Sequence, residues 1–186
     1  MAEFHIPSLH LHPAEAALVG KILVSYGELE FDLCQCIKSA LNDLDVAVKV
    51  LYRTRGETQR VLIADALGRP IYTNHRLETE FSEAIGAMRH CLKIRNQYAH
   101  CNWNHDEGGL SFIAFEDIAA ENAHVSQGRL TKYRLDKTLL ENQESYFSST
   151  REALWFLDWE LQLRAGRISS HAFPRPQRVP RPPQHN

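Results

Sequence analysis

Residues 13–41 read PAEAALVGKILVSYGELEFDLCQCIKSAL, and their pattern decides the fold class. Apolar residues recur here at steps of four and three, which places them on one stripe of an α-helix. The stripe consists of Leu18, Ile22, Tyr26, Leu29, Leu33, Ile37 and Leu41. Pro13 suits the first turn of such a helix, and Gly27 inside it indicates close approach by a neighbouring helix. The stretch therefore predicts a long helix whose stripe other helices must cover.

The rest of the chain supplies those helices. Segments 44–52 and 58–67 predict two shorter helices that pair antiparallel, with Gly68, Arg69 and Pro70 as a stop signal. A second long helix is expected to begin near Arg76 and a third to cover about 136–165, because both segments show helical periodicity. The expected fold is mainly α, an antiparallel helical bundle.

Two regions lack helical periodicity. Residues 106–109, DEGG, lie between NWN and LSFIAF and predict a short β-hairpin, while residues 129–135 alternate as a third strand does. The insertion before the last helix thus covers about 102–135, with an irregular or briefly helical segment at 116–127. From residue 169 the frequent prolines predict a disordered, extended tail to residue 186. The expected organisation is a flexible N-terminus at 1–12, one helical domain at 13–168, and the tail.

Composition limits the functions that are open to the chain. At 186 residues with a net charge of −2, it has no overall attraction to a polyanion, so any contact with RNA must be local. No signal peptide is evident and no apolar run approaches the roughly eighteen residues of a membrane span, which predicts a soluble cytoplasmic protein. The four cysteines are expected to be reduced thiols. A zinc site from Cys91, Cys101, His90 and His100 lacks the usual ligand spacing, so neither metal nor cofactor is expected.

The residues suited to chemistry gather in RNQYAH, residues 95–100, at the predicted end of the second long helix. Asn96 and His100 are four apart and share a face, whereas Arg95 lies roughly 140° from His100 around an ideal helix. Arg95 also lies at a position where the apolar stripe of the second long helix would continue. An arginine offers a planar fork that matches phosphate, and a histidine exchanges protons near neutral pH. Together they suit the transfer of a phosphoryl group.

RNQYAH resembles the R-x-x-x-x-H signature of the HEPN family (higher eukaryotes and prokaryotes nucleotide-binding), including the polar residue after the arginine. YGELEFDL in the first helix is similar to a stretch common near the start of bacterial HEPN-like proteins. The resemblance covers roughly residues 13–103 and the last long helix. The predicted hairpin and the tail lie outside it.

The resemblance implies a metal-independent RNA endonuclease in which the substrate's 2′-hydroxyl attacks the adjacent phosphate and leaves a cyclic phosphate end. His100 would be the general acid or base, Arg95 would stabilise charge on the phosphate, and Asn96 would orient His100 or hold the phosphate. The resemblance also implies a homodimer through the motif-bearing helix, and a toxin or phage-defence role with an antitoxin protein as a possible partner. Glu30 would tether Arg95, while Tyr98 and Trp103 would stack on bases.

Other interpretations of these residues stay open. Arg95 can be a structural partner of Glu28 or Glu30, His100 can be a helix C-cap, and both aromatic residues can be core packing. The alternative function is a non-catalytic HEPN-like module that binds RNA or protein. A scaffold that docks through its Pro/Arg tail is a third possibility.

Overall fold

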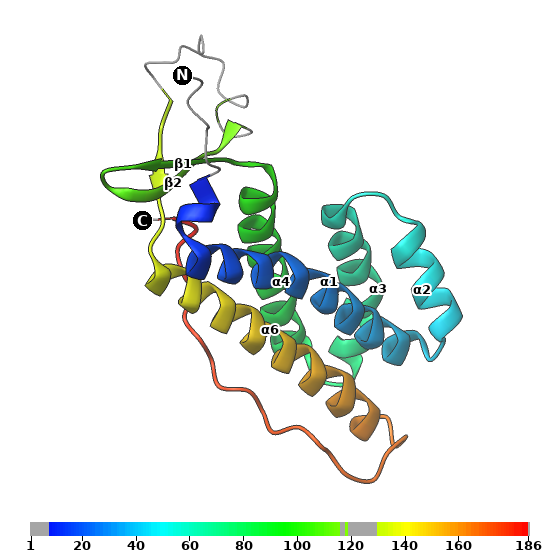
Figure 1. The fold of residues 1–186 in the computed structure, drawn as a ribbon. Helices are drawn as coiled ribbons and strands as arrows, with labels where there is room; N and C mark the ends of the chain where they lie inside the picture. Colours follow the sequence, from blue (N-terminus) through cyan, green and yellow to red (C-terminus); the bar gives the residue numbers. More distant parts are fainter. Residues whose placement is uncertain (1–7, 116–117, 119–129, 186) are drawn as a thin grey trace. The chain divides into compact units, whose positions relative to one another are not determined.

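The computed structural model describes residues 8–115, 118 and 130–185 (Figure 1). The described helices are the 3₁₀-helix η1 (Ser8–Leu11), α1 (Pro13–Leu41), α2 (Leu44–Arg53), α3 (Glu57–Asn74), α4 (Glu78–His100) and α6 (Lys137–Arg164). The strands β1 (Asn102–Asp106), β2 (Gly109–Ile113) and β3 (Tyr133–Arg134) form one antiparallel sheet in the order β1-β2-β3. The predicted mainly α class with a small β insertion is confirmed. The segment predicted as irregular or briefly helical, 116–127, lies outside the described residues except for residue 118.

The chain divides into two compact units, which are described separately. The sheet unit contains Met1–Val24, Lys93–Ser145 and Pro182–Asn186, and the helical unit contains Ser25–Leu92 and Tyr146–Arg181. Within the described residues, all three strands belong to the sheet unit, and α2 and α3 belong to the helical unit. Each of the long helices α1, α4 and α6 contributes residues to both.

In the helical unit, α1 is packed by α3 and α6. Its predicted stripe is buried at Tyr26, Leu29, Leu33 and Ile37. The Tyr72 hydroxyl of α3 donates to the Cys36 carbonyl at 3.2 Å, and the Cys36 thiol donates to the Leu154 carbonyl of α6 at 3.2 Å. Arg151 of α6 also binds Asp32 and Glu28 of α1, at 3.0 and 2.6 Å. Apolar burial and these polar contacts together hold the three helices.

The predicted stop at Gly68, Arg69 and Pro70 is wrong, because α3 continues through Pro70 to Asn74. A proline inside a helix forfeits one backbone hydrogen bond and costs about 3 kcal/mol. Contacts made by the residues on either side of Pro70 offset that cost. Tyr72 is buried with its ring stacked on Phe81 at 4.4 Å between centroids, and Arg69 donates to Ser82 at 2.8 Å.

The glycine that allows close packing is also not the one predicted. Among the described residues nothing lies within 4 Å of the position where Gly27 would carry a Cβ, so no neighbouring helix approaches there. A Cβ on Gly68 would instead lie 2.6 Å from Cζ of Phe81 and 3.1 Å from Cδ1 of Ile37. Gly68 is therefore the position at which α3 must lack a side chain.

In the sheet unit, the predicted hairpin is confirmed. β1 pairs with β2 in a register that joins Trp103 to Phe112 and Asp106 to Gly109. The third strand is shorter than the predicted 129–135, and it joins β2 through the pair Phe112 and Tyr133. Phe112 is fully buried and contacts the rings of Tyr98, Trp103 and Tyr133. This aromatic cluster ties the sheet to the end of α4.

The remaining features of the fold concern membrane-spanning character, the cysteines and the tail. Within the described residues, no helix combines the length and apolar character needed to cross a membrane. Cys34, Cys36, Cys91 and Cys101 are all free thiols. Residues 169–185 form neither helix nor strand, but several of their side chains have defined contacts with the helices. The disorder that the composition predicted for this tail stays a prediction.

Candidate functional site

The candidate site is built on the last two turns of α4, in the sheet unit. His100 is the final residue of the helix, as predicted. The buried stripe runs through Ile94 and Tyr98, and not through Arg95, which was predicted to continue it. Arg95 is half-buried at the edge of that stripe and Ala99 is exposed. This placement lets the guanidinium of Arg95 reach the surface while its stem packs.

Asn96 and His100 share one face of α4 and line the same cavity of about 340 Å³. Lys93 and Gln97, on the same face, also line it, together with Cys101, Ala114 and Gln184. The predicted proximity of Asn96 and His100 is confirmed. Lys93 and His100 are both exposed, so the cavity has a permanent cation and a titratable imidazole on one wall.

Arg95 does not line this cavity, but it is connected to it. Its Nη1 donates to Oδ1 of Asn96 at 3.0 Å. That bond brings the cationic side chain back toward the face that carries Asn96 and His100. With Oδ1 accepting from Arg95, the Nδ2 group is the donor that Asn96 can present to a ligand.

Tyr98 has a structural role that the sequence left open. It is buried, and its hydroxyl donates to Oε1 of Gln143 on α6 at 2.5 Å. Burial raises the pKa of Tyr98. Nε2 of Gln143 in turn donates to the Pro183 and Gln184 carbonyls, at 2.8 and 3.1 Å. The structure therefore supports the core-packing interpretation of Tyr98 over base stacking.

Gln184 is the tail residue that completes the cavity wall. Its carbonyl also accepts a hydrogen bond from Nε2 of Gln97 at 2.8 Å. Two glutamine amides, from α4 and α6, thus hold the end of the tail beside His100. A ligand in the cavity would contact Gln184 as well as α4.

Trp103 is half-buried at the start of β1. Its ring lies 5.8 Å from that of Tyr98 and 6.0 Å from that of Phe112 between centroids. Its carbonyl accepts a hydrogen bond from the hydroxyl of Ser8 at 3.3 Å. Packing therefore accounts for most of this side chain, and only its exposed part is open to a base.

Glu30 lies in the helical unit, where it binds a different arginine from the one predicted. Nη1 of Arg60 contacts both carboxylate oxygens of Glu30 at 3.0 Å. Glu28, the other candidate partner of Arg95, binds Arg151 at 2.6 Å. Both carboxylates are therefore engaged by arginines of the helical unit.

Within the described part of the chain, no three His, Cys, Asp or Glu side chains gather in a way that would hold a metal. Burial raises the pKa of Cys101, and that of Cys91, to about 12, so both thiols keep their protons at neutral pH. Close to β1, Nε2 of His12 lies 2.9 Å from Nδ1 of His105. The sequence assigned His12 to a flexible N-terminus and did not predict this contact.

The sequence did not predict that Lys93, Gln97 and Gln184 belong to the candidate site. Lys93 could have been found, because it precedes Asn96 by three residues and His100 by seven, which is helical spacing along one face. Gln184 carries no such signal.

Comparisons with protein-family models, with curated proteins and with solved structures found no match. Any assignment of function therefore depends on the chemistry of the site itself.

Proposed function

We propose that this chain is an RNA endonuclease of HEPN type that needs no metal and cuts with Arg95, Asn96 and His100. One observation carries the proposal. Asn96 and His100 line one cavity at the end of α4, and Arg95 is hydrogen-bonded to that same Asn96 at 3.0 Å. The three residues of the motif thus form one connected group.

The cavity suits part of a nucleotide. A volume of about 340 Å³ lies at the lower end of the range for small-molecule sites, which is enough for a phosphate and the ribose beside it. Lys93 and Arg95 supply local positive charge on a chain whose net charge is −2. Such local charge attracts a phosphodiester without making the whole surface a nucleic-acid binder.

Each residue has a role in transesterification. The imidazole of His100 accepts the proton of the ribose 2′-hydroxyl, whose oxygen then bonds to the adjacent phosphorus. The bond from phosphorus to the 5′-oxygen breaks, and that oxygen takes up a proton. Arg95 and the Nδ2 group of Asn96 stabilise the charge on the non-bridging oxygens. The products are a 2′,3′-cyclic phosphate and a 5′-hydroxyl.

A homodimer would supply the second proton-transfer group. One imidazole cannot act as base and acid in the same step, and a second copy that faces the first along α4 would bring another His100. Ala99, one turn of α4 after Arg95, is exposed and leaves room for such a pairing. A toxin or phage-defence role with an antitoxin as partner rests on the family resemblance alone.

The test is cleavage of labelled RNA in the presence of a chelator, with analysis of the product ends. Wild type should produce cyclic phosphate ends, and Arg95→Ala, Asn96→Ala and His100→Ala should lose most or all activity. His10→Ala and Arg53→Ala are matched controls, because both remove an exposed side chain of the same type elsewhere in the chain. Both controls should cut as wild type does.

Three results would contradict the proposal. Equal cleavage by wild type and by His100→Ala would indicate a contaminating nuclease. Binding of RNA without cleavage, weakened by Arg95→Ala and Lys93→Ala, would identify the chain as the alternative, a non-catalytic RNA-binding module. Loss of activity on chelation would contradict the metal-independent mechanism.

A further inference from the structure

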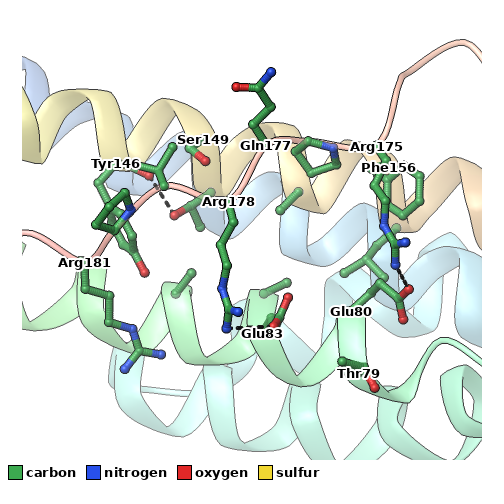
Figure 2. A pocket seen from close by; sticks show the side chains of 18 residues that line it. Thr79, Glu80, Glu83, Tyr146, Ser149, Phe156, Arg175, Gln177, Arg178 and Arg181 are labelled. Carbon is green, nitrogen blue, oxygen red and sulfur yellow. Dashed lines mark hydrogen bonds and ion pairs between the residues drawn. The ribbon is translucent and has the colours of Figure 1, made fainter.

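A cavity of about 700 Å³ lies in the helical unit (Figure 2). Its walls come from three segments. α4 contributes Glu80, Glu83 and Ala87, and α6 contributes Tyr146, Ala153 and Phe156. The third wall is the chain's own tail, residues 175–181. We call the surface that α4 and α6 form beneath this tail segment the α4–α6 groove.

The tail lies in the groove with a period of three residues. Phe173, Pro176 and Val179 are half-buried, while the residues between them are exposed. Three residues per turn is the repeat of the polyproline II helix, which leaves one face of the peptide for a partner surface. The prolines at 174, 176 and 180 favour this conformation, so little entropy is lost when the tail docks.

An aromatic contact anchors the start of the segment. The ring of Phe173 lies 5.4 Å from the ring of Trp155 and 5.6 Å from that of Trp159, between centroids. Trp155 and Trp159 are one turn apart on α6 and half-buried. Proline-rich peptides are commonly recognised by aromatic grooves of this kind.

Charge complementarity sets the register. Arg175 forms an ion pair with Glu80, and Nη2 of Arg178 lies 2.9 Å from Oε1 of Glu83 (Figure 2). Both arginines point toward α4, whereas Gln177 points away from it. Two arginines of the tail thus pair with two carboxylates on one helix.

Arg181 continues the same row. A Cβ on Gly86 of α4 would lie 2.8 Å from Nη2 of Arg181, so the glycine leaves room for this guanidinium. Arg181 also hydrogen-bonds the Tyr146 hydroxyl and so opposes the rise in the pKa of Tyr146 that burial causes. The basic, proline-containing tail therefore lies along a groove that is acidic and partly aromatic.

These contacts are individually weak. The Arg175 and Arg178 side chains are 68% and 86% exposed, and exposed ion pairs typically contribute about 0–1 kcal/mol and weaken with salt. The tail is held mainly because it is tethered, which gives it an effective concentration on the order of millimolar. A ligand held in this way leaves and returns readily.

We infer that the α4–α6 groove is a binding site for an extended peptide rich in arginine and proline. Residues 173–181 of this chain are its resident ligand, and a peptide of the same chemistry can replace them. The carboxylates of Glu80 and Glu83 select a basic peptide and oppose a nucleic acid. This inference does not depend on the proposed ribonuclease activity, because every residue that carries it lies in the helical unit.

The experiment uses the full chain and a fluorescent synthetic peptide of residues 169–181, with binding followed by anisotropy. In the variant R175E/R178E, like charges face Glu80 and Glu83, so the tail should leave the groove. The peptide should then bind this variant roughly tenfold or more tightly than it binds wild type, where the tail competes. High salt should weaken the binding.

Two controls test the register and the anchor. Adding Glu80→Arg and Glu83→Arg to R175E/R178E restores complementary charge in cis, so peptide binding should fall back to the wild-type value or below. The full-length variant Phe173→Ala, which loosens the tail without changing charge, should also bind the peptide more tightly than wild type. A peptide with glutamine at 175 and 178 should bind none of them well.

The inference would be overturned by peptide binding that is equal in wild type, R175E/R178E and Phe173→Ala, or absent from all three. Loss of helical circular dichroism in both loosened variants would also overturn it. That result would mean that the tail is an integral part of the fold rather than an exchangeable ligand.

Discussion

The guanidinium of Arg95 donates a hydrogen bond to the side-chain oxygen of Asn96, the next residue of α4, at 3.0 Å. Neighbouring residues on a helix point about 100° apart, so only the length of the arginine allows this contact. The bond joins Arg95 to the face that carries His100. It is the geometric basis of the proposed cleavage site.

Arg95→Lys tests whether the planar guanidinium of Arg95 is required for cleavage. A lysine keeps the charge but cannot hold Asn96 and a phosphate with one planar group. Single-turnover cleavage should slow by about 10²–10³-fold, the usual loss when one donor to a developing oxyanion is removed. Lys93→Arg is the control and should keep most activity. A fully active Arg95→Lys would show that only the charge matters.

Tyr98→Phe tests the link between α4, α6 and the tail. The substitution leaves the buried Gln143 Oε1 without its 2.5 Å donor, which should lower the free energy of unfolding by about 1–3 kcal/mol. Urea unfolding followed by circular dichroism measures this change. Tyr52→Phe is the control, because Tyr52 is 46% exposed and should lose almost nothing. Equal stability of the two variants would mean that the hydroxyl of Tyr98 contributes little.

Gly68→Ala and Gly27→Ala should have opposite effects. Alanine normally favours a helix over glycine by about 1 kcal/mol. At Gly68, however, the new Cβ would lie 2.6 Å from the ring of Phe81, so the variant should be less stable by about 1–3 kcal/mol. At Gly27 nothing described lies within 4 Å, so alanine should stabilise by up to about 1 kcal/mol. Thermal unfolding of both variants checks the sign, and a stabilised Gly68→Ala would contradict the close packing.

The thiol of Cys101 should resist alkylation until the chain unfolds. Burial raises its pKa from 9.0 to about 12, so the thiolate fraction at pH 8 should be about a thousandfold smaller in the folded protein. Iodoacetamide labelling with and without urea, read by mass spectrometry, measures the ratio. Rapid labelling of Cys101 in the folded protein would show that the site opens frequently.

The same pKa predicts how stability depends on pH. Above pH 9 the unfolded chain releases the thiol proton that the folded chain retains up to about pH 12. The contribution of Cys101 to stability is therefore complete below pH 9 and is lost as pH rises from 9 to 12. Urea unfolding of wild type and Cys101→Ser across this range measures the difference. Parallel curves for the two proteins would contradict the shift.

Much of the fold could be predicted because it is encoded locally. The bounds predicted for α1, Pro13 and Leu41, are those observed, since its apolar stripe is long and begins with a proline. The hairpin followed from the DEGG turn, and the end of α4 at His100 from the change of period after it. The shared face of Asn96 and His100 needed only helical geometry.

Other features depend on which segments meet. Pro70 lies inside α3 because Tyr72 and Arg69 gain contacts with Phe81 and Ser82, which no local rule contains. Arg60 binds Glu30 through a contact thirty residues apart in the sequence. A hydrophobic pattern predicts which face is buried, but it does not identify the partner that covers that face.

The helices, the hairpin and the motif at the end of α4 were therefore predictable from local patterns. The residues that lie against them were not. Gln184 beside His100, and Arg175 and Arg178 beside Glu80 and Glu83, are pairs separated by more than eighty residues. Periodicity reports the environment of a residue within one segment, whereas these pairs depend on charge and shape complementarity between distant segments. Local backbone preferences act over a few residues, whereas long-range contacts form only when distant segments meet in the folded chain.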